Sequence, residues 1–326
     1  MQRPLFVLGA VALFATRSVP AQQTAVDPHC QSLTSGDACQ KALDLYKYLN
    51  NQLGTLIVGG NATLGQGGTL GGLGHFSVGV RLNFLQAHVP DVHVFTTQSP
   101  GPAVSTTFRT DGKYVAFPQA DVAIGLFRGF PIGITYIGGV DGLVSVAYLP
   151  TFEKNDVQVS NSVGALRFGF GGRIGLLQET VLTPGISVSY IERNLPKATI
   201  VADGSYGVSD MDLNAKSWRI VANKTVLGIG LGAGFGRDYY DSHASLVYPP
   251  SGALPQNPPG TTSNTVATSP TRTSIFGDLS FNLIPLIKFV GELGRVSGGS
   301  VNTFNTYDRS PNESQWYGSI GARVVF

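Results

Sequence analysis

Apolar and polar residues alternate with a period of two over most of the chain after residue 72. Val, Leu, Ile and Phe occupy every second position of many segments, and small or polar residues stand between them. This period sends neighbouring side chains to opposite faces of an extended chain. It predicts ten strands, near 73–86, 115–129, 132–149, 160–176, 181–194, 211–223, 225–240, 271–283, 285–299 and 314–326.

The lengths and spacing of these segments distinguish a membrane barrel from a soluble sandwich, which would show the same alternation. Many segments reach the 9–11 residues that a tilted strand needs to cross a bilayer. Short connections, such as Asn223–Lys224, alternate with long ones, such as 241–270. An even strand number with both chain ends on one side is typical of single-chain bacterial barrels. We therefore expect an all-β, antiparallel barrel of ten strands, with twelve as the alternative.

The last residues, WYGSIGARVVF, alternate and end on Phe326. This ending resembles the C-terminal strand of Gram-negative outer-membrane β-barrel proteins, in which it is read by the barrel-assembly machinery. The resemblance implies a bacterial outer-membrane location, with outer-membrane lipid and the assembly machinery as partners. It also implies that both chain termini are periplasmic and that Phe326 is an assembly signal.

One predicted strand, within 226–240 (VLGIGLGAGFGRDYY), is an extreme case of the alternation. In a barrel, its apolar residues would face lipid and its glycines would face the lumen. Glycine weakens a strand and often marks a close approach by another group. We expect the glycines to make room for a plug or passage, or to allow tight barrel curvature; they are Gly228, Gly230, Gly232, Gly234 and Gly236.

The N-terminal residues have the pattern of a secretory signal peptide. Arg3 precedes an apolar run at 5–15, and Val19-Pro20-Ala21 offers a small-residue cleavage site. An exported chain meets oxidising conditions, so we expect its two cysteines, Cys30 and Cys39, to form a disulfide.

A single helix is predicted between the signal peptide and the barrel. Asp37 and Gln40 are spaced to cap its start, and Ala42, Tyr46 and Leu49 share one face. A glycine-rich segment follows. The chain is therefore divided into a signal peptide at 1–21, a helix and glycine-rich segment at 22–72 that is a possible plug, and a barrel at 73–326.

Charge excludes some functions and suggests others. Loss of the signal peptide with its two arginines leaves 20 basic against 20 acidic residues, so the chain has no basic footprint for nucleic acid. Charged residues on the inward face of the predicted strands would form ion pairs, or a constriction that selects anions. The candidates for lining the lumen are Arg81, Asp121, Arg167, Arg173, Asp278, Lys288, Glu292 and Arg323.

Little in the sequence indicates catalysis. His88, Asp91 and His93 lie in one predicted outer loop, and Asp241 and His243 lie with Asp238 and Tyr240 at the start of another. Some ten-stranded outer-membrane proteases use Asp and His in such loops, but no motif of that family is recognisable. Nucleotide, nucleophile-elbow and C-x-x-C motifs are also absent from the sequence. We therefore expect no catalytic residues, no metal and no cofactor.

Two function classes stay open. The first is a passive transport or pore-type barrel for a small solute. Gly59-Gly60-Asn61-Ala62 after the helix is similar to the hatch of the long-chain fatty-acid transporter family, although ten strands are too few for that family. The second is a structural or adhesive surface barrel that acts through its outer loops. An outer-membrane enzyme is a distant third.

Overall fold

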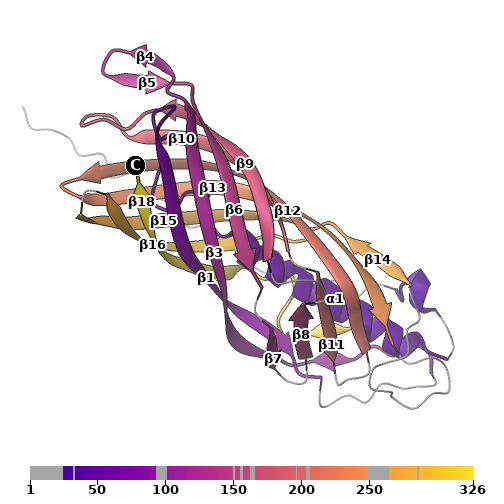
Figure 1. Cartoon of the computed structure of the whole chain (residues 1–326). Coiled ribbons are helices and arrows are strands. Elements are labelled where there is room, and N and C mark those ends of the chain that lie inside the picture. The colour runs from indigo at the N-terminus through magenta and orange to yellow at the C-terminus, as the bar shows by residue number, and fades with distance from the viewer. Residues whose placement is uncertain are drawn as a thin grey trace, which may run out of the picture.

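The computed structural model describes residues 25–31, 34–92, 101–149, 151–154, 157–161, 166–195, 197–202, 206–248, 264–284 and 286–326 (Figure 1). The expected signal peptide at 1–21 lies outside these residues. Two helices are described, the short 3-10 helix η1 (Pro28–Cys30) and α1 (Gly36–Val58). Neither is long and apolar enough to cross a membrane.

Ten antiparallel strands form one closed barrel, as the alternation predicts. Each strand pairs with the next along the chain, and the first pairs with the last, which closes the sheet. The expected fold class and the count of ten are confirmed, and the alternative of twelve is wrong. The barrel strands are β1 (Phe76–Pro90), β3 (Thr110–Phe127), β6 (Gly139–Tyr148), β9 (Leu166–Leu177), β10 (Gly185–Asn194), β12 (Tyr206–Val226), β13 (Ile229–Val247), β15 (Thr271–Ile284), β16 (Ile287–Ser297) and β18 (Gln315–Val325).

The two faces of the barrel wall differ as a membrane requires. On β13 the outward side chains of Ile229, Leu231 and Phe235 are exposed, whereas Gly230 and Asp238 point inward and are buried. Large apolar side chains are exposed in the same way on the outer face of the other strands. Lipid is the surrounding in which such an apolar belt is stable.

Short strands extend the barrel at both ends (Figure 1). The end with the long connections is called the loop end, and the end with Phe326 is called the turn end. At the loop end, β11 (Ala198–Ala202), β8 (Val157–Asn161) and β7 (Phe152–Lys154) continue the sheet from β12, and β14 (Thr265–Thr268) pairs with β13. β2 (Thr107–Phe108) and β17 (Thr306–Tyr307) pair beside them, while β4 (Phe130–Ile132) and β5 (Thr135–Ile137) form a hairpin at the turn end.

The turn between β12 and β13 lies further along the chain than the alternation predicts. Leu227 and Gly228 form it with φ angles of 51° and 82°. Two central residues with positive φ are the geometry of a type I′ hairpin turn. The expected connection at Asn223–Lys224 is wrong because Asn223 is buried in the wall and Lys224 Nζ donates to Val181 O (2.8 Å).

Helix α1 lies inside the barrel at the loop end (Figure 1). Of its 23 residues only Lys47 is not buried. The predicted apolar face packs on the wall, and polar atoms of the helix, including the hydroxyl group of Tyr46 on that face, bond to it. Tyr46 Oη donates to Ser242 Oγ (2.9 Å), and Gln52 Nε2 donates to His88 O (2.7 Å). A helix enclosed on all sides needs such partners because buried polar groups are costly without hydrogen bonds.

The start of α1 differs from the prediction. Ser35 is at the N-cap position without a side-chain cap, and the helix begins at Gly36. Asp37 Oδ2 accepts a hydrogen bond from Lys41 Nζ (2.7 Å), while Gln40 Nε2 donates to Asp44 Oδ1 (3.0 Å). The capping role expected for Asp37 and Gln40 is wrong because both side chains have partners elsewhere.

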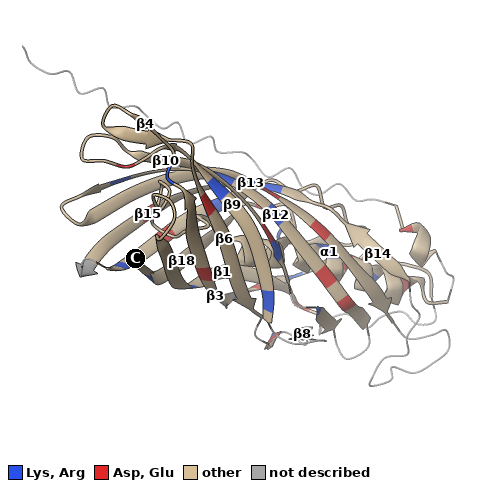
Figure 2. Cartoon of the chain, turned by 45° about the horizontal axis from the view of Figure 1, so that its top comes forward, with Lys and Arg blue, Asp and Glu red and all other residues tan. Residues whose placement is uncertain are grey.

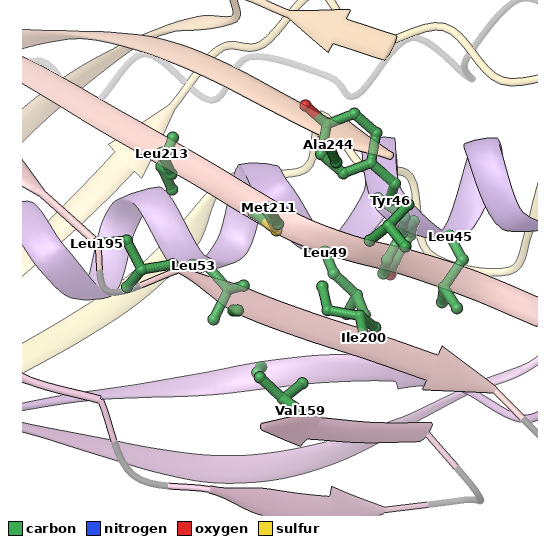
Figure 3. Close-up of a cluster of buried hydrophobic side chains, with 14 of the residues drawn as sticks. Leu45, Tyr46, Leu49, Leu53, Val159, Leu195, Ile200, Met211, Leu213 and Ala244 are labelled. Atoms are coloured by element: carbon green, nitrogen blue, oxygen red, sulfur yellow. The ribbon is translucent and has the colours of Figure 1, made fainter. Parts of the chain in front are cut away.

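A hydrophobic core joins α1 to the loop-end strands. Apolar side chains from the helix meet others from β8, β11, β12 and β13, and each is at most 5% exposed. Figure 3 shows the helix side chains pointing into this cluster. The loop end is therefore packed like the core of a soluble domain; members of the cluster include Leu45, Tyr46, Leu49, Leu53, Val159, Leu195, Ile200, Met211, Leu213 and Ala244.

The first described residues and the C-terminus lie at opposite ends of the barrel (Figure 1). His29 O accepts from Asn264 Nδ2 (3.4 Å) at the loop end, and Phe326 pairs with Phe76 at the start of β1. The described N-terminal segment is therefore at the opposite end of the barrel from Phe326, because α1 enters the lumen from the loop end. The expectation that both termini are periplasmic stays a prediction, since residues 1–24 lie outside the described residues. The expected disulfide between Cys30 and Cys39 is present in this N-terminal segment, and the Cα atoms of the two cysteines are 5.3 Å apart.

Candidate functional site in the barrel lumen

The lumen segment, residues 59–72, runs from the end of α1 through the barrel to the start of β1. Arginines of the wall donate hydrogen bonds to its first carbonyl groups and to the last one of the helix. The carbonyls at a helix C-terminus have no partner within the helix and carry the negative end of its dipole. The bonds are Arg193 Nη1 to Val58 O (3.2 Å), Arg219 Nη2 to Gly59 O (3.0 Å), Arg219 Nε to Gly60 O (3.1 Å) and Arg81 Nη1 to Asn61 O (2.8 Å).

Carboxylates of neighbouring strands pair with Arg81 and Arg219, and also with Arg173, which donates to Thr63 Oγ1 of the lumen segment. Figure 2 shows basic and acidic positions on adjacent strands of the wall. Most of the paired side chains are nearly inaccessible, and a buried charge is tolerated only with a partner. The arginines are therefore held rigidly where the lumen segment meets them; the pairs are Arg81–Asp121 (2.8 Å), Arg173–Asp141 (2.5 Å) and Arg219–Asp238 (2.7 Å).

Two further carboxylates, Asp278 and Glu292, face each other on β15 and β16. Both bind Asn61 of the lumen segment: its backbone N donates to Glu292 Oε2 (2.8 Å), and its Nδ2 donates to Asp278 Oδ2 (3.1 Å). A Cβ atom on Gly60 would lie 2.1 Å from Glu292 Oε1. Glycine at this position is what lets the lumen segment approach the acidic pair.

The predicted lumen-lining residues fall into two groups. Arg81, Arg173, Asp278, Glu292 and Arg323 are buried on the inward face, each at most 5% exposed, and Asp121 joins them through its pair with Arg81. The other two lie toward the ends of the lumen, outside this cluster. Arg167 is at the loop end of β9, where Nη1 donates to Leu166 O (3.3 Å), and Lys288 is half-buried near the turn end.

Sequence reasoning missed several charged residues of the lumen. Arg219 was obscured by Lys216 and Trp218, since three large side chains in four residues hide the alternation. Arg193 was not singled out, although it stands an even number of positions after the inward Ser187. Counting every second position from a known inward residue would have identified both. The missed residues are Asp141, Arg193, Arg219, Asp238 and Arg272, each at most 2% exposed.

The inward glycines of β13 make room for side chains of the neighbouring strands. A Cβ on Gly234 would lie 2.2 Å from the Phe276 ring, and one on Gly236 would lie 2.4 Å from Arg219 Cδ. Gly230 and Gly232 likewise adjoin Ser280 and Asp278. The space left by these glycines is therefore filled by large side chains of the barrel wall rather than by the helix.

Gly228 is the exception among the predicted lumen glycines. It lies in the turn with φ 82°, and a Cβ there would meet nothing within 4 Å. Its placement in the lumen is wrong because the strand begins at Ile229. At this position glycine is favoured by the positive φ.

We predict that Gly234→Val destabilises the barrel by about 1–3 kcal/mol because the added atoms collide with Phe276. The control is Ala233→Val, one residue away on the lipid face, which should cost much less. Urea-dependent unfolding in detergent, followed by tryptophan fluorescence, measures both. Phe276→Ala in the Gly234→Val background should recover part of the loss; equal costs for Gly234→Val and Ala233→Val would contradict the packing role.

A buried acid at the loop end, Asp44, has no ion pair among the described residues. Asp44 of α1 accepts hydrogen bonds from Asn305 N (2.8 Å) and Asn305 Nδ2 (2.7 Å). Burial raises the pKa of the Asp44 carboxyl to about 6, while the hydrogen bonds from Asn305 act in the opposite direction. This contact ties the connection between β16 and β18 to the helix.

Among the described residues, the loop side chains considered for catalysis do not form one group. Asp238 is buried beside Arg219, whereas His243 lies on the outer face with its Nε2 3.6 Å from Asp241 Oδ1. His93 lies outside the described residues. Within the described ranges, no group of three or more His, Cys, Asp and Glu side chains is placed to hold a metal ion.

No protein-family model and no curated protein matches the chain. Among solved structures, the outer membrane protease OmpT from Escherichia coli is 11% identical, with TM-score 0.36 over 77% of this chain and 95% of that one. The Neisserial surface protein A is 8% identical, with TM-score 0.31 over 77% and 98%. The Pseudomonas putida toluene transporter TodX is 10% identical, with TM-score 0.31 over 77% and 88%. These likenesses are too distant to assign a role.

Two features of the described residues classify the protein. Its wall is a closed sheet with an apolar outer belt, and its lumen holds a helix and a polar segment bound by paired charges. The chain is a closed, ten-stranded antiparallel β-barrel whose lumen holds a helix.

Proposed function

We propose that the protein is a closed surface barrel that presents its loop end outside the cell. The observation that carries this proposal is the core between α1 and the loop-end strands. Moving the helix out of the lumen would expose that core to water, at about 25 cal/mol per Å² of apolar surface. A structural or adhesive role through the loop end is therefore favoured over an open pore.

The orientation follows from the positions of the connections. Outer-membrane barrels have short turns in the periplasm and long loops outside. The turn end then faces the periplasm together with Phe326, whose ring stacks on Phe76 with centroids 4.6 Å apart. That position is accessible to the assembly machinery, and the described N-terminal segment at the loop end is extracellular. We propose no enzymatic role.

Two measurements on the full chain test this function. Purified protein in planar lipid bilayers should give no stable single-channel conductance. On intact cells, a cysteine at His243 should react with a membrane-impermeant thiol reagent, while a cysteine at Leu227 in the turn should not. Regular conductance steps would contradict the closed barrel, and labelling at position 227 alone would reverse the orientation.

Transport of a small solute is the second candidate, and one observation favours it. A cavity of about 740 Å³ lies at the turn end beside the glycines that end the lumen segment, Gly71 and Gly72. Both have positive φ, 101° and 99°. Movement of this segment would connect the cavity to the lumen without disturbing the loop-end core, and the conductance measurement distinguishes this candidate from the first.

A further inference from the structure

The cavity at the turn end is assembled from four parts of the chain. Leu70 and Leu73 come from the end of the lumen segment, Phe127 and Arg128 from the end of β3, and Tyr136 from β5. The connection between β9 and β10 completes the lining. A volume of about 740 Å³ is within the range of small-molecule sites.

Gln178, in the connection between β9 and β10, joins the lumen segment to the hairpin of β4 and β5. Its Oε1 accepts from Thr69 N (3.1 Å) and its Nε2 donates to Thr69 O (2.8 Å), which fixes the lumen segment. Its backbone N donates to Tyr136 O (2.9 Å), and its carbonyl accepts from Thr135 Oγ1 (2.7 Å), which fixes the hairpin. The cavity walls are therefore held in place by hydrogen bonds.

Arg128 supplies positive charge to this cavity. Its guanidinium lies 4.4 Å from the centroid of the Tyr136 ring. The ion pairs found among the described residues do not include Arg128. The acidic residue of the lining, Glu179, accepts from Thr225 N instead. An arginine with an aromatic neighbour and no carboxylate partner is suited to bind an anionic group.

The rest of the lining mixes apolar side chains with the polar groups of His75, Gln178, Glu179 and Thr180. Leu73, Leu126, Phe127 and Ile134 are 82%, 49%, 42% and 63% exposed. Burying these side chains against an apolar group would be favourable. The cavity thus combines an arginine that has no ion pair among the described residues with several apolar side chains, which suits a small molecule that has an anionic group and an apolar body.

We propose that this cavity binds a molecule carrying a phosphate or carboxylate and a short apolar or aromatic body. Arg128 holds the anionic group, and Leu73, Phe127 and Ile134 contact the body. The proposal does not depend on the surface role argued above, because it concerns the opposite end of the barrel.

The probe is phenyl phosphate, titrated by calorimetry into the full-length protein in a neutral detergent. We expect saturable binding to the wild type and at least tenfold weaker binding to Arg128→Gln. Arg237→Gln is the matched control, since Arg237 also lies over a tyrosine, Tyr239 (5.4 Å), but far from the cavity. It should bind the probe like the wild type. Equal affinity of the Arg128→Gln variant and the wild type would overturn the proposal.

Two more measurements keep the test independent of folding. Leu73→Asp places a carboxylate at an exposed position of the lining and should abolish binding without unfolding the barrel. Phenyltrimethylammonium has the same ring with the opposite charge and should not bind; if it binds as well as phenyl phosphate, the anion site is refuted.

The anionic group could belong to a soluble molecule or to a lipid headgroup. Titration in nanodiscs separates the two sources. Equal phenyl phosphate affinity in phosphatidylglycerol and phosphatidylcholine indicates a soluble ligand, and weaker affinity in phosphatidylglycerol indicates a competing headgroup. Either result supports the site, whereas loss of all binding in both nanodiscs contradicts it.

Discussion

Replacing Arg219 with methionine is expected to destabilise the barrel by about 3–5 kcal/mol, the cost of leaving a buried charge without its partner. Asp238 is 0% exposed and would lose the guanidinium that lies 2.7 Å away. The carbonyls of Gly59 and Gly60 would lose their donors at the same time. The lumen segment should therefore become mobile before the barrel unfolds.

The measurement is the free energy of unfolding in urea, together with heat-dependent mobility on gels. Arg237→Met is the matched control: it removes an exposed arginine of β13, across the strand pair from Trp218, and should change stability by less than about 1 kcal/mol. Adding Asp238→Leu to Arg219→Met should recover part of the loss, because it removes the unpaired charge. Equal effects of the Arg219 and Arg237 variants would contradict the role of the lumen network.

Replacing Ala233 with arginine should cost about 2–4 kcal/mol, as for a cation near the middle of the bilayer on the lipid face. Ala233 is exposed on the outside of β13, between the turn at Gly228 and the arginine at 237. The new guanidinium would have acyl chains rather than water around it.

The control for this variant is His243→Arg, which lies on the same strand and the same face but beyond the apolar belt. It should be nearly neutral, because its side chain meets water. Folding into lipid vesicles followed by urea unfolding gives both values. If the two arginines cost the same, the apolar belt of β13 does not contact lipid.

Much of the barrel could be predicted because lipid acts on each strand directly. A residue that faces lipid must be apolar, and every second residue of a strand faces outward. The alternation of apolar residues therefore predicts which residues of β9 and β13 face lipid and which face the lumen. The strand number and the pairing of Cys30 with Cys39 were predictable for similar local reasons. The turn at Leu227 was not, since leucine is an unusual residue for a positive φ.

The residues that bind the lumen segment could be predicted only in part. Arg81 and Glu292 stand on inward positions of clearly alternating strands, so their burial follows from the sequence. The inward position of Arg219 was hidden by Lys216 and Trp218, but its partners could not be predicted in any case, because Asp238 lies on the next strand and the carbonyl of Gly59 is more than 150 residues away. The cap expected at Asp37 was wrong because its two carboxylate oxygens accept from Lys41 Nζ in the next turn of the helix and from the distant Val104 N (3.2 Å).

The sequence by itself determined that this protein is a membrane barrel, because the contrast between lipid and lumen acts on every residue of a strand in turn. Only the tertiary structure decided what fills the barrel. Whether α1 lies in the lumen, from which end it enters, and which arginines meet Gly59 and Gly60 depend on contacts between residues far apart in the chain. Such contacts are set by packing and charge pairing in three dimensions, and they leave no period along the sequence.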